Sequence, residues 1–400
     1  MFTLEDLLKA YLSCRKNKRN TINALKFEKN FESNILELFE ELKNRTYRPG
    51  RSICFVVTYP KLREVFAADF RDRVIHHLLV SHLEPHFEKR FIYSSFACRK
   101  KKGLLTATLY FKRMIRSATH NYTKRAFYGQ FDIRSFFTSI DKNILKEIII
   151  HEIADHFPKN RKDDLIWLTE IILNHNPIDN YYFKGDPALL KQIPPHKTLF
   201  KAEKNRGLPI GNLTSQFFAN VYLNELDQYV KRELKIKHYV RYVDDFIILS
   251  NNLEEIKLWR EQIDTFLKEK LRLVLHPNKD KYNSVYPGID FVGYIVKPTY
   301  TLARKRVVQN LKTKLHCFNQ GKLLVSQNQK QQTFLLSAPP TKQELEKMLA
   351  MVNSYFGHFK HANCYTLRKD LYDNHFRNLK SYLMPIDDNF SYFILVTKQK

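Results

Sequence analysis

The chain has 400 residues, 44% of them hydrophobic, so it can form two or three domains with real cores and is not a disordered tail. Its 67 lysine and arginine residues against 41 aspartate and glutamate residues give a formal net charge of +26 at pH 7, which indicates a polyanionic partner. With 14% aromatic residues and no basic amphipathic anchor or lipidation signal, this balance favours nucleic acid over a membrane surface.

Five cysteines are scattered without a Cys-x-x-Cys pair, so the sequence suggests neither a cysteine zinc module nor a disulfide framework. The sequence opens without a signal-peptide pattern, and no apolar run approaches the roughly 18 residues that span a bilayer. We therefore expect a soluble protein of the reducing cytoplasm.

In the first half of the chain, apolar residues at helical spacing predict two amphipathic helices within residues 1–44, which form an N-terminal helical cap. Residues 47–79 predict a strand, a turn at Tyr59-Pro60, a second strand and a helix that begins near Asp69. Residues 127–134, FYGQFDIR, indicate a buried strand that ends in a charge and precedes the helix DKNILKEIIIHEI.

The second half mixes the two kinds of element. Residues from about 157 to 206 are rich in lysine and turn residues, and GLPIGNLTSQFFANVYLNEL then predicts a loop and a long helix with Thr214 or Ser215 as N-cap. A hairpin, a helix and three strand-like pieces in LRLVLHPNKDKY and GIDFVGYIV follow. From about residue 301 strand signals stop, and the polar stretch VSQNQKQQTFLLSAPPT separates basic helical segments. Without βαβ regularity, this order predicts an α+β fold.

The hairpin HYVRYVDDFIILS places Asp244 and Asp245 side by side at the tip of a strand pair. Like charges in a half-buried site repel, so a divalent cation is the obvious partner, and Mg²⁺ prefers such hard oxygen ligands. Asp132, which ends its own apolar strand, is the expected third carboxylate, and the carbonyl of Ile133 can add a ligand. The alternative is a plain hairpin turn, because aspartate tolerates the positive φ angles that such turns require.

The motifs FDIRSFF, GLPIGNLTSQ, YVDD and FVGY stand in the order found in reverse transcriptases, and the chain resembles this family from about residue 45 to about residue 380. The resemblance implies an RNA-directed DNA polymerase with a right-hand fold, an antiparallel palm sheet and a helical thumb. On this basis we expect fingers over 45–125, a palm over 126–300 with an inserted basic segment 157–206, and a thumb and C-terminal tail over 301–400.

The resemblance also implies a catalytic centre. Asp132 and Asp244 would hold two Mg²⁺ ions, for which Mn²⁺ can substitute, and Asp245 would complete the acidic cluster. Phe137 stands where the family keeps a ring that blocks a ribose 2′-hydroxyl, so deoxynucleotides are the expected substrates. Ordinary core packing is the alternative for Phe136 and Phe137, and we expect it for one of the two.

Other residues match family positions near the substrates. Those expected to contact the nucleotide are Lys61, Arg63, Arg99, Ile210, Gly211, Gln216 and Lys279. Those expected to contact nucleic acid are Gly293 and Tyr294 of a primer-grip hairpin, and His358, Lys360 and His361 of the thumb. Solvated cations, a strand bend and packed histidines are the plain alternatives. The glycines of GLPIG indicate a close backbone approach, for which nucleotide and template base are the expected visitors.

The subtype and the biological role rest on finer likenesses. IGNLTSQ, FAADFRDRVIHHLL and LEPHFEKRF resemble the reverse transcriptases of diversity-generating retroelements, which copy a template RNA with frequent errors opposite adenine. Ile210 replaces a glutamine of many relatives and removes a polar check, so low fidelity is the hypothesis.

Three other roles stay open. An antiviral defence enzyme that makes cDNA on a noncoding RNA is the main rival, and the form of CRKKKGLLTAT favours it. A group II intron maturase and a non-catalytic RNA-binding scaffold are weaker rivals, and the scaffold predicts loss of a carboxylate, whereas all three are present. The implied partners are template RNA, primer, cDNA product and dNTPs, with an accessory protein or a second polymerase left open.

Overall fold

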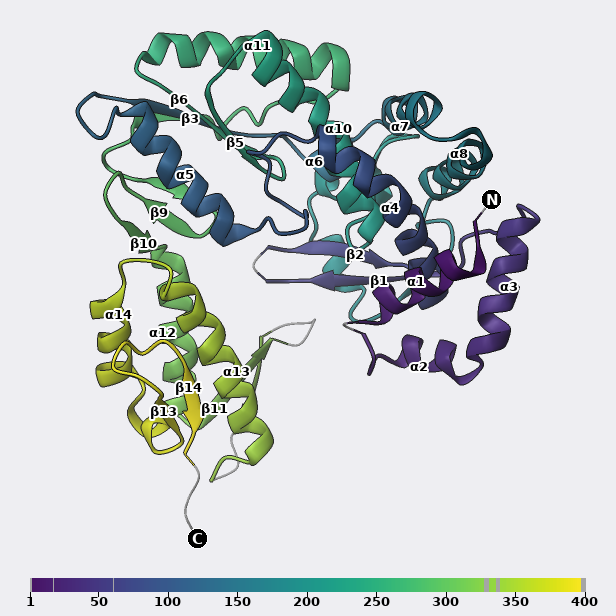
Figure 1. Ribbon diagram of the computed structural model, residues 1–400. Coiled ribbons are helices and arrows are strands. Elements are labelled where there is room, and N and C mark those ends of the chain that lie inside the picture. Colours follow the sequence, from purple (N-terminus) through teal and green to yellow (C-terminus); the bar gives the residue numbers. More distant parts are fainter. Residues whose placement is uncertain (1, 17, 60, 327–330, 336–338, 397–400) are drawn as a thin grey trace. The chain divides into compact units, whose positions relative to one another are not determined.

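The computed structural model describes residues 2–16, 18–59, 61–326, 331–335 and 339–396, without the side chains of 322–335. The chain forms two compact units (Figure 1). One consists of Met1–Lys100, Gly129–Ile248 and Glu254–Lys281, and the other of Lys101–Tyr128, Leu249–Leu253 and Tyr282–Lys400. Within the described residues, no helix is both long and apolar enough to cross a membrane.

The first unit opens with three helices, where the apolar spacing predicted two. These are α1 (Leu4–Arg15), α2 (Ile22–Lys29) and α3 (Phe31–Lys43). The prediction was wrong because Asn30, with φ −124° and ψ 48°, interrupts the second helix without disturbing the apolar spacing. The following helix α4 (Phe70–Arg90) has Asp69 as its N-cap, as predicted, and packs along α1.

A three-stranded sheet follows in the order β2-β1-β4. Its hairpin of β1 (Ser52–Val57) and β2 (Arg63–Ala67) is antiparallel, as expected. Of the predicted turn at Tyr59-Pro60, Pro60 lies outside the described residues. The third strand, β4 (Tyr181–Phe183), runs parallel to β1.

The segment 157–206 therefore contains more regular secondary structure than its content of lysine and turn residues predicted. It contains a sixteen-residue helix, α8 (Lys159–Asn174), in addition to β4. The helix forms because Leu165, Leu168 and Leu173 recur at helical spacing among the lysines and bury one face.

The second sheet of interest carries the aspartates. Its order is β5-β6-β3-β7, with β5 (His238–Tyr242), β6 (Asp245–Ser250), β3 (Phe127–Asp132) and β7 (Lys281–Ser284). Only two residues join β5 to β6, so these neighbouring strands run antiparallel.

Two helices pack on this sheet, α10 (Leu213–Gln228) and α11 (Leu253–Leu271). The strand predicted in LRLVLH does not form. Arg272 takes a left-handed conformation (φ 48°) directly after α11, and Leu275 makes only an isolated antiparallel bridge to Ile133.

The second unit combines α5 (Leu104–Ala118) with a small sheet and a helical body. The sheet has the order β10-β9-β8, formed by β8 (Ile289–Phe291), β9 (Tyr294–Val296) and β10 (Thr301–Ala303). The body contains α12 (Lys305–Asn319), α13 (Lys342–Phe359) and α14 (Tyr365–Asp370) around a core that includes Leu315, Val352 and Phe356.

Strands continue beyond residue 301, contrary to the prediction. Besides β10, two antiparallel hairpins are present, β11 (Lys322–Ser326) with β12 (Gln331–Leu335) and β13 (Leu383–Pro385) with β14 (Phe393–Leu395). Polar composition concealed the first hairpin, because strands pair through backbone hydrogen bonds, which polar side chains do not prevent.

The chain is thus an α+β protein with mostly antiparallel sheets. The remaining short elements and one longer helix are α6 (Phe136–Ser139), α7 (Lys142–His156), α9 (Ala188–Lys191), η1 (Pro195–Lys197), η2 (Leu199–Lys201), η3 (Tyr229–Glu233), η4 (Leu371–His375) and η5 (Arg377–Ser381).

Candidate active site

The alternation of side chains along β3 decides which residues face away from the covering helices. Gly129 faces α11, because a Cβ there would lie 2.6 Å from the Cγ2 of Ile256. Phe131 shares this side and packs on Phe246 of β6, with 5.4 Å between ring centroids. The intervening Gln130 and the final Asp132 therefore face the opposite side of the sheet.

Asp245 joins them on that side, because it directly precedes Phe246 in β6. Gln130 Nε2 donates to both carboxylate oxygens of Asp245 at 3.2 Å. Sequence reasoning did not find Gln130, although its position two residues before Asp132 on the same strand was the available signal. Gln130 fixes the orientation of the second aspartate of the doublet.

Asp244 lies in the two-residue loop between β5 and β6, and the loop is strained at its other residue. Val243 has a φ of 59°, and a left-handed β-branched residue is an outlier that costs of the order of 1–3 kcal/mol. The plain-turn alternative relied on aspartate taking the positive φ angle. Within the described residues that angle belongs to the valine, so the turn geometry does not explain the two aspartates.

A buried ion pair between Arg241 and Asp227 holds the backbone of this loop in place. Arg241 of β5 binds Asp227 of α10 through Nε at 2.8 Å and Nη2 at 2.5 Å. Its third nitrogen, Nη1, donates to the carbonyl of Val243 at 2.9 Å. Both charged side chains are almost completely buried, so removal of either one would leave an uncompensated charge beneath the aspartate loop.

The carboxylates of Asp132, Asp244 and Asp245 repel one another at a site that is partly withdrawn from water. Withdrawal from water raises the pKa of Asp244 to about 6, and the adjacent carboxylate of Asp132 contributes to the rise. The same withdrawal raises the pKa of Asp245 to about 7, with the hydrogen bond from Gln130 opposing it and the charges of Asp132 and Asp244 adding to it. A cation at this place would relieve the repulsion.

Basic side chains gather beside Asp132. Lys279 forms an ion pair with its carboxylate. Burial lowers the pKa of Lys61, as do the charges of Lys279, Arg63 and Lys197, while Asp132 raises it. The predicted residues Lys61, Arg63 and Lys279 are therefore brought together. Lys197 of η1 was not predicted, because nothing in the basic segment 157–206 distinguished it from the other lysines.

The donor set fits hard divalent cations. Three carboxylates converge from two adjacent strands, and oxygen ligands of this kind are those that Mg²⁺ and Mn²⁺ prefer. The bridge between Ile133 and Leu275 uses the carbonyl of Asp132 and the amide of Arg134, so it does not consume the Ile133 carbonyl.

Arg99 is a correction to the predicted nucleotide contacts. The residue is only 9% exposed, and its guanidinium binds Glu88 through Nε at 3.0 Å and Nη2 at 2.8 Å. Nη1 donates to the carbonyls of Ile92 and Ser95 at 2.7 and 2.8 Å. These bonds secure the chain after α4, so the arginine is occupied by the protein itself.

The close approaches of the GLPIG loop are also made to protein. A Cβ on Gly207 (φ 88°) would lie 3.3 Å from the Thr138 carbonyl oxygen, and one on Gly211 (φ 128°) would lie 2.8 Å from that of Phe66. The carbonyl of Ile210 accepts a hydrogen bond from the Phe66 amide at 2.8 Å. The close approach of β2 and of the α6 turn therefore explains the two glycines, in place of the expected approach of nucleotide and template base.

The same loop positions Phe137 and begins α10. The amide of Leu208 donates to the carbonyl of Phe137 at 2.7 Å. Phe136 is 2% exposed and belongs to the core, whereas Phe137 is only half-buried, so one phenylalanine packs, as expected. The N-cap of α10 is Asn212, not Thr214 or Ser215, and its side chain accepts a hydrogen bond from the Ala68 amide at 3.1 Å and none from the helix. Gln216 lies exposed in the first turn.

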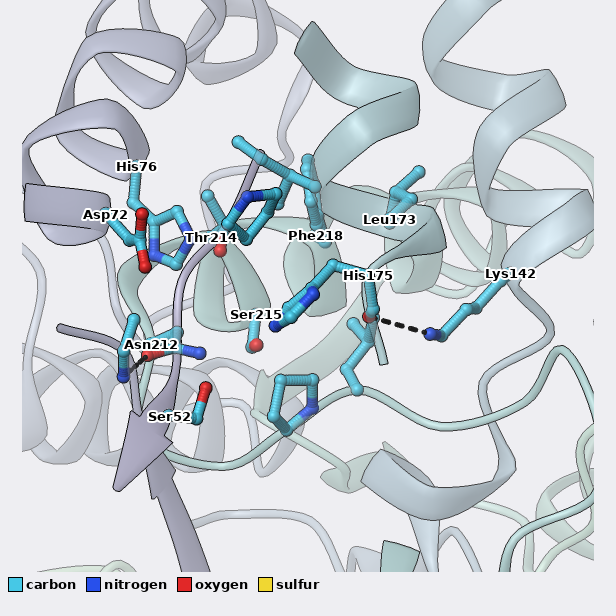
Figure 2. Close-up of a pocket in the computed structure, with 15 residues that line it drawn as sticks. Ser52, Asp72, His76, Lys142, Leu173, His175, Asn212, Thr214, Ser215 and Phe218 are labelled. Atoms are coloured by element: carbon cyan, nitrogen blue, oxygen red, sulfur yellow. Dashed lines mark hydrogen bonds between the residues drawn. The ribbon is translucent and has the colours of Figure 1, made fainter. Parts of the chain in front are cut away.

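A small cavity of about 30 Å³ is lined by Asn212, Thr214 and Ser215 together with polar groups of α4 and α7. Figure 2 shows these side chains. Lys142 donates to the carbonyl of His175 at 3.4 Å on one side of it. None of the three aspartates lines this cavity, whose size suits a water molecule. The cavity is therefore separate from the aspartate cluster.

In the second unit, Val292 (φ 43°) and Gly293 (φ 92°) form a tight turn between β8 and β9, so the primer-grip motif is a hairpin and not a bend in one strand. The ring of Tyr294 stacks on His358 of α13 at 4.1 Å, and its hydroxyl donates to the His358 carbonyl at 2.9 Å. His358 is thus packed against the hairpin, while Lys360 and His361 are exposed.

Comparisons with known proteins agree with this geometry. A family model described as reverse transcriptase (RNA-dependent DNA polymerase) matches residues 59–296. Protein YkfC of Escherichia coli (strain K12) is 22% identical over 309 residues, which cover 68% of this chain and 74% of YkfC. The group II intron-encoded protein LtrA of Lactococcus lactis subsp. cremoris is 23% identical over 331 residues, covering 66% of this chain and 50% of LtrA. The matched region thus spans about half the length of LtrA.

Among solved structures, apo telomerase from Candida Tropicalis, truncated from the C-terminal domain, is similar with a TM-score of 0.45 and 13% identity. The similarity covers 64% of this chain and 55% of the telomerase chain.

Proposed function

This chain belongs to the reverse transcriptase (RNA-dependent DNA polymerase) family, and we propose that it makes cDNA from a dedicated template RNA at a site built on Asp132, Asp244 and Asp245. The observation that carries the proposal is the meeting of Asp132 with Asp244 at the ends of adjacent strands, with lysines gathered around Asp132. A chain that only bound RNA would have no need for carboxylates that repel one another.

Enzymes of this family use divalent metal ions, and we assign two Mg²⁺ ions, replaceable by Mn²⁺, to Asp132, Asp244 and the Ile133 carbonyl, with Asp245 completing the cluster. Such ions lower the pKa of the primer 3′-hydroxyl and stabilise the leaving pyrophosphate. The protein supplies the carboxylates, and Gln130 holds Asp245 in orientation. A bound cation would relieve the repulsion among the three carboxylates, and this relief favours ion binding at neutral pH.

The basic residues receive the triphosphate of the incoming dNTP. The charges of Lys279, Arg63 and Lys197 all lower the pKa of Lys61, so these cations lie within electrostatic range of Lys61. Lys279 is held by Asp132 in the free protein. If Asp132 held a divalent cation, Lys279 would lose this partner and would be available to the phosphates. Phe137, half-buried above the packed Phe136, is assigned as the ring that rejects a ribose 2′-hydroxyl.

Primer extension tests the assignment of the catalytic carboxylates. An RNA template annealed to a DNA primer is incubated with dNTPs and Mg²⁺, and Asp244→Asn is expected to lower the rate by at least about 100-fold. Asp163→Asn, an equally conservative change at an exposed position of α8, is expected to leave the rate unchanged. Equal extension by the wild type and Asp244→Asn would exclude the proposed catalysis. RNA binding without extension by the wild type would favour a scaffold.

For the biological role, we propose an error-prone enzyme of a diversity-generating retroelement, supported by the loop IGNLTSQ with Ile210. The domain borders at residues 44, 125 and 300, and the contacts of Lys360, His361 and the hairpin of Gly293 and Tyr294 with primer and template, belong to the same proposal. Sequencing of the RNA and cDNA that copurify with the protein distinguishes the roles. Errors scattered at adenines support diversification, and a simple repetitive product supports antiviral defence.

A further inference from the structure

Three side chains of the metal-ligand type meet where α4 and α7 end. They are His86 of α4 and Glu152 and His156 of α7, and their ligand atoms all lie within 4.8 Å of one another. Among the described residues this is the one group of three histidine, cysteine or acidic side chains that is so close together. None of the three takes part in the proposed polymerase chemistry.

Their distances suit a tetrahedral ion. His86 Nε2 lies 2.8 Å from Glu152 Oε2, and His156 Nδ1 lies 3.4 Å from the same oxygen. Ligands at about 2.0–2.1 Å from Zn²⁺ in a tetrahedral site are separated from one another by about 3.3–3.4 Å. Both imidazole nitrogens lie within 3.4 Å of one carboxylate oxygen, so small side-chain shifts would place an ion among the three groups.

The surroundings provide the second layer of a metal site. Glu152 is buried, and its other oxygen, Oε1, accepts a bond from Arg90 Nη2 at 2.9 Å, which holds Oε2 toward the imidazoles. Hydrogen bonds to a ligating carboxylate are characteristic of metal sites. His156 is 44% exposed, so solvent reaches the group and can provide a fourth ligand.

The competing arrangement is a set of hydrogen bonds without an ion. A proton on His86 Nε2 satisfies its contact with Glu152, and a proton on His156 Nδ1 can also serve the Glu152 carbonyl oxygen at 3.3 Å. Metal binding displaces these protons and uses the same nitrogens and the same oxygen. The hydrogen-bonded state and the metal-bound state therefore have the same fold and differ in whether an ion is bound.

We propose that His86, Glu152 and His156 bind a Zn²⁺ ion, with water as the fourth ligand, separately from the aspartate cluster. Two imidazoles and one carboxylate with an open position are a donor set that zinc favours, whereas Mg²⁺ favours oxygen ligands alone. The ion joins the end of α7 to the end of α4. The inference is independent of the proposed polymerase function.

Zinc titration by calorimetry tests the proposal on the full chain without a histidine tag, after removal of metal. The wild type and His151→Ala are expected to bind one equivalent of Zn²⁺ with the same affinity. His151 is the matched control because it is an exposed histidine of the same helix, 76% exposed, that pairs with Asp155. His86→Gln and His156→Ala are expected to weaken zinc binding by at least about 100-fold. Equal zinc affinity in the wild type and both variants would overturn the proposal.

Two further measurements guard against misfolding and against binding elsewhere. Circular dichroism identifies variants that keep the fold, and zinc is expected to raise the melting temperature of the wild type and of His151→Ala but not of His86→Gln. The double variant Asp132→Asn with Asp244→Asn is expected to retain the zinc equivalent. Loss of that equivalent in the aspartate variant would place the ion at the catalytic cluster and reject the site at His86.

Discussion

Val243 and Asp244 show how the backbone of one residue serves the chemistry of the next. The valine takes the left-handed conformation at φ 59°, and Arg241 holds its carbonyl in place from the buried pair with Asp227. Strain of this kind persists only where surrounding contacts determine it, and it is concentrated at functional sites. The unfavourable valine therefore fixes where the Asp244 carboxylate lies relative to Asp132.

Ile210 is the residue on which the proposed low fidelity depends. Its carbonyl is bound by Phe66, while its side chain is half-buried, so Ile210→Gln can add an amide without breaking the loop. The added hydrogen-bonding group is expected to lower the misincorporation rate, because a polar site rejects a wrong partner better than an apolar one. The readout is sequencing of cDNA made on one defined RNA template.

Asp163→Asn, the exposed change on α8, is the control for the fidelity assay and is expected to copy the template with the error rate of the wild type. Unchanged fidelity in Ile210→Gln, with activity retained, would refute the role assigned to the isoleucine.

At the scale of elements, the GLPIG loop joins three parts of the first unit. Hydrogen bonds from Gly207 to Ile140 and from Leu208 to Phe137 attach it to the segment after Asp132, and the bond between Ile210 and Phe66 attaches it to β2. The proposed sugar-rejecting ring and the β1–β2 hairpin are thereby connected through one loop to the segment that carries Asp132. The conformation of one loop thus coordinates residues from distant parts of the sequence.

Gly211→Ala tests this coordination. The new Cβ would lie 2.8 Å from the Phe66 carbonyl oxygen at a φ of 128°, so we expect a loss of stability of about 1–3 kcal/mol together with reduced primer extension. Thermal unfolding measures the first effect.

Gly357→Ala is the matched control, because a Cβ there meets nothing within 4 Å and the residue lies inside α13. We expect it to be neutral or slightly stabilising, since alanine favours a helix by about 1 kcal/mol over glycine. If Gly211→Ala were as harmless as Gly357→Ala, the loop would not be under the constraint described.

At the scale of the whole molecule, charge dominates. A net charge of +26 suits a partner as acidic as RNA, yet three carboxylates are held together within this basic protein. Their mutual repulsion destabilises the folded protein without bound metal, and it contributes to pKa values of about 6 for Asp244 and about 7 for Asp245. Binding of divalent cations and stability against unfolding should therefore be linked through pH.

The metal-free protein should become more stable on acidification from about pH 8 to about pH 5.5. The folded-state pKa values of Asp244 and Asp245, about 6 and about 7, lie above the ordinary value of 3.8, so the folded protein keeps protons that the unfolded chain releases. This stabilisation is fully present below the ordinary value and is lost as pH rises through 6 and 7. Melting temperatures measured in the presence of a chelator check it.

The comparison variant is Asp244→Asn with Asp245→Asn, which removes both titrations and is expected to show a flatter dependence over the same range. Mg²⁺ added at about pH 8 should raise the melting temperature of the wild type and leave that of the variant unchanged. Parallel pH profiles for the two proteins would contradict the linkage.

The local pattern of the sequence was sufficient for the α+β class, the helix after Asp69, the β1–β2 hairpin and the meeting of Asp132 with Asp244. Each of these follows from short-range periodicity or from motifs whose order is tied to a family. The tertiary structure alone decided that Arg99 binds Glu88, that the GLPIG glycines face protein backbone, that Lys197 lies near Lys61 and that Gln130 binds Asp245. Those outcomes depend on which distant side chain arrives within hydrogen-bonding or Coulomb range, and spacing along one chain does not carry that information.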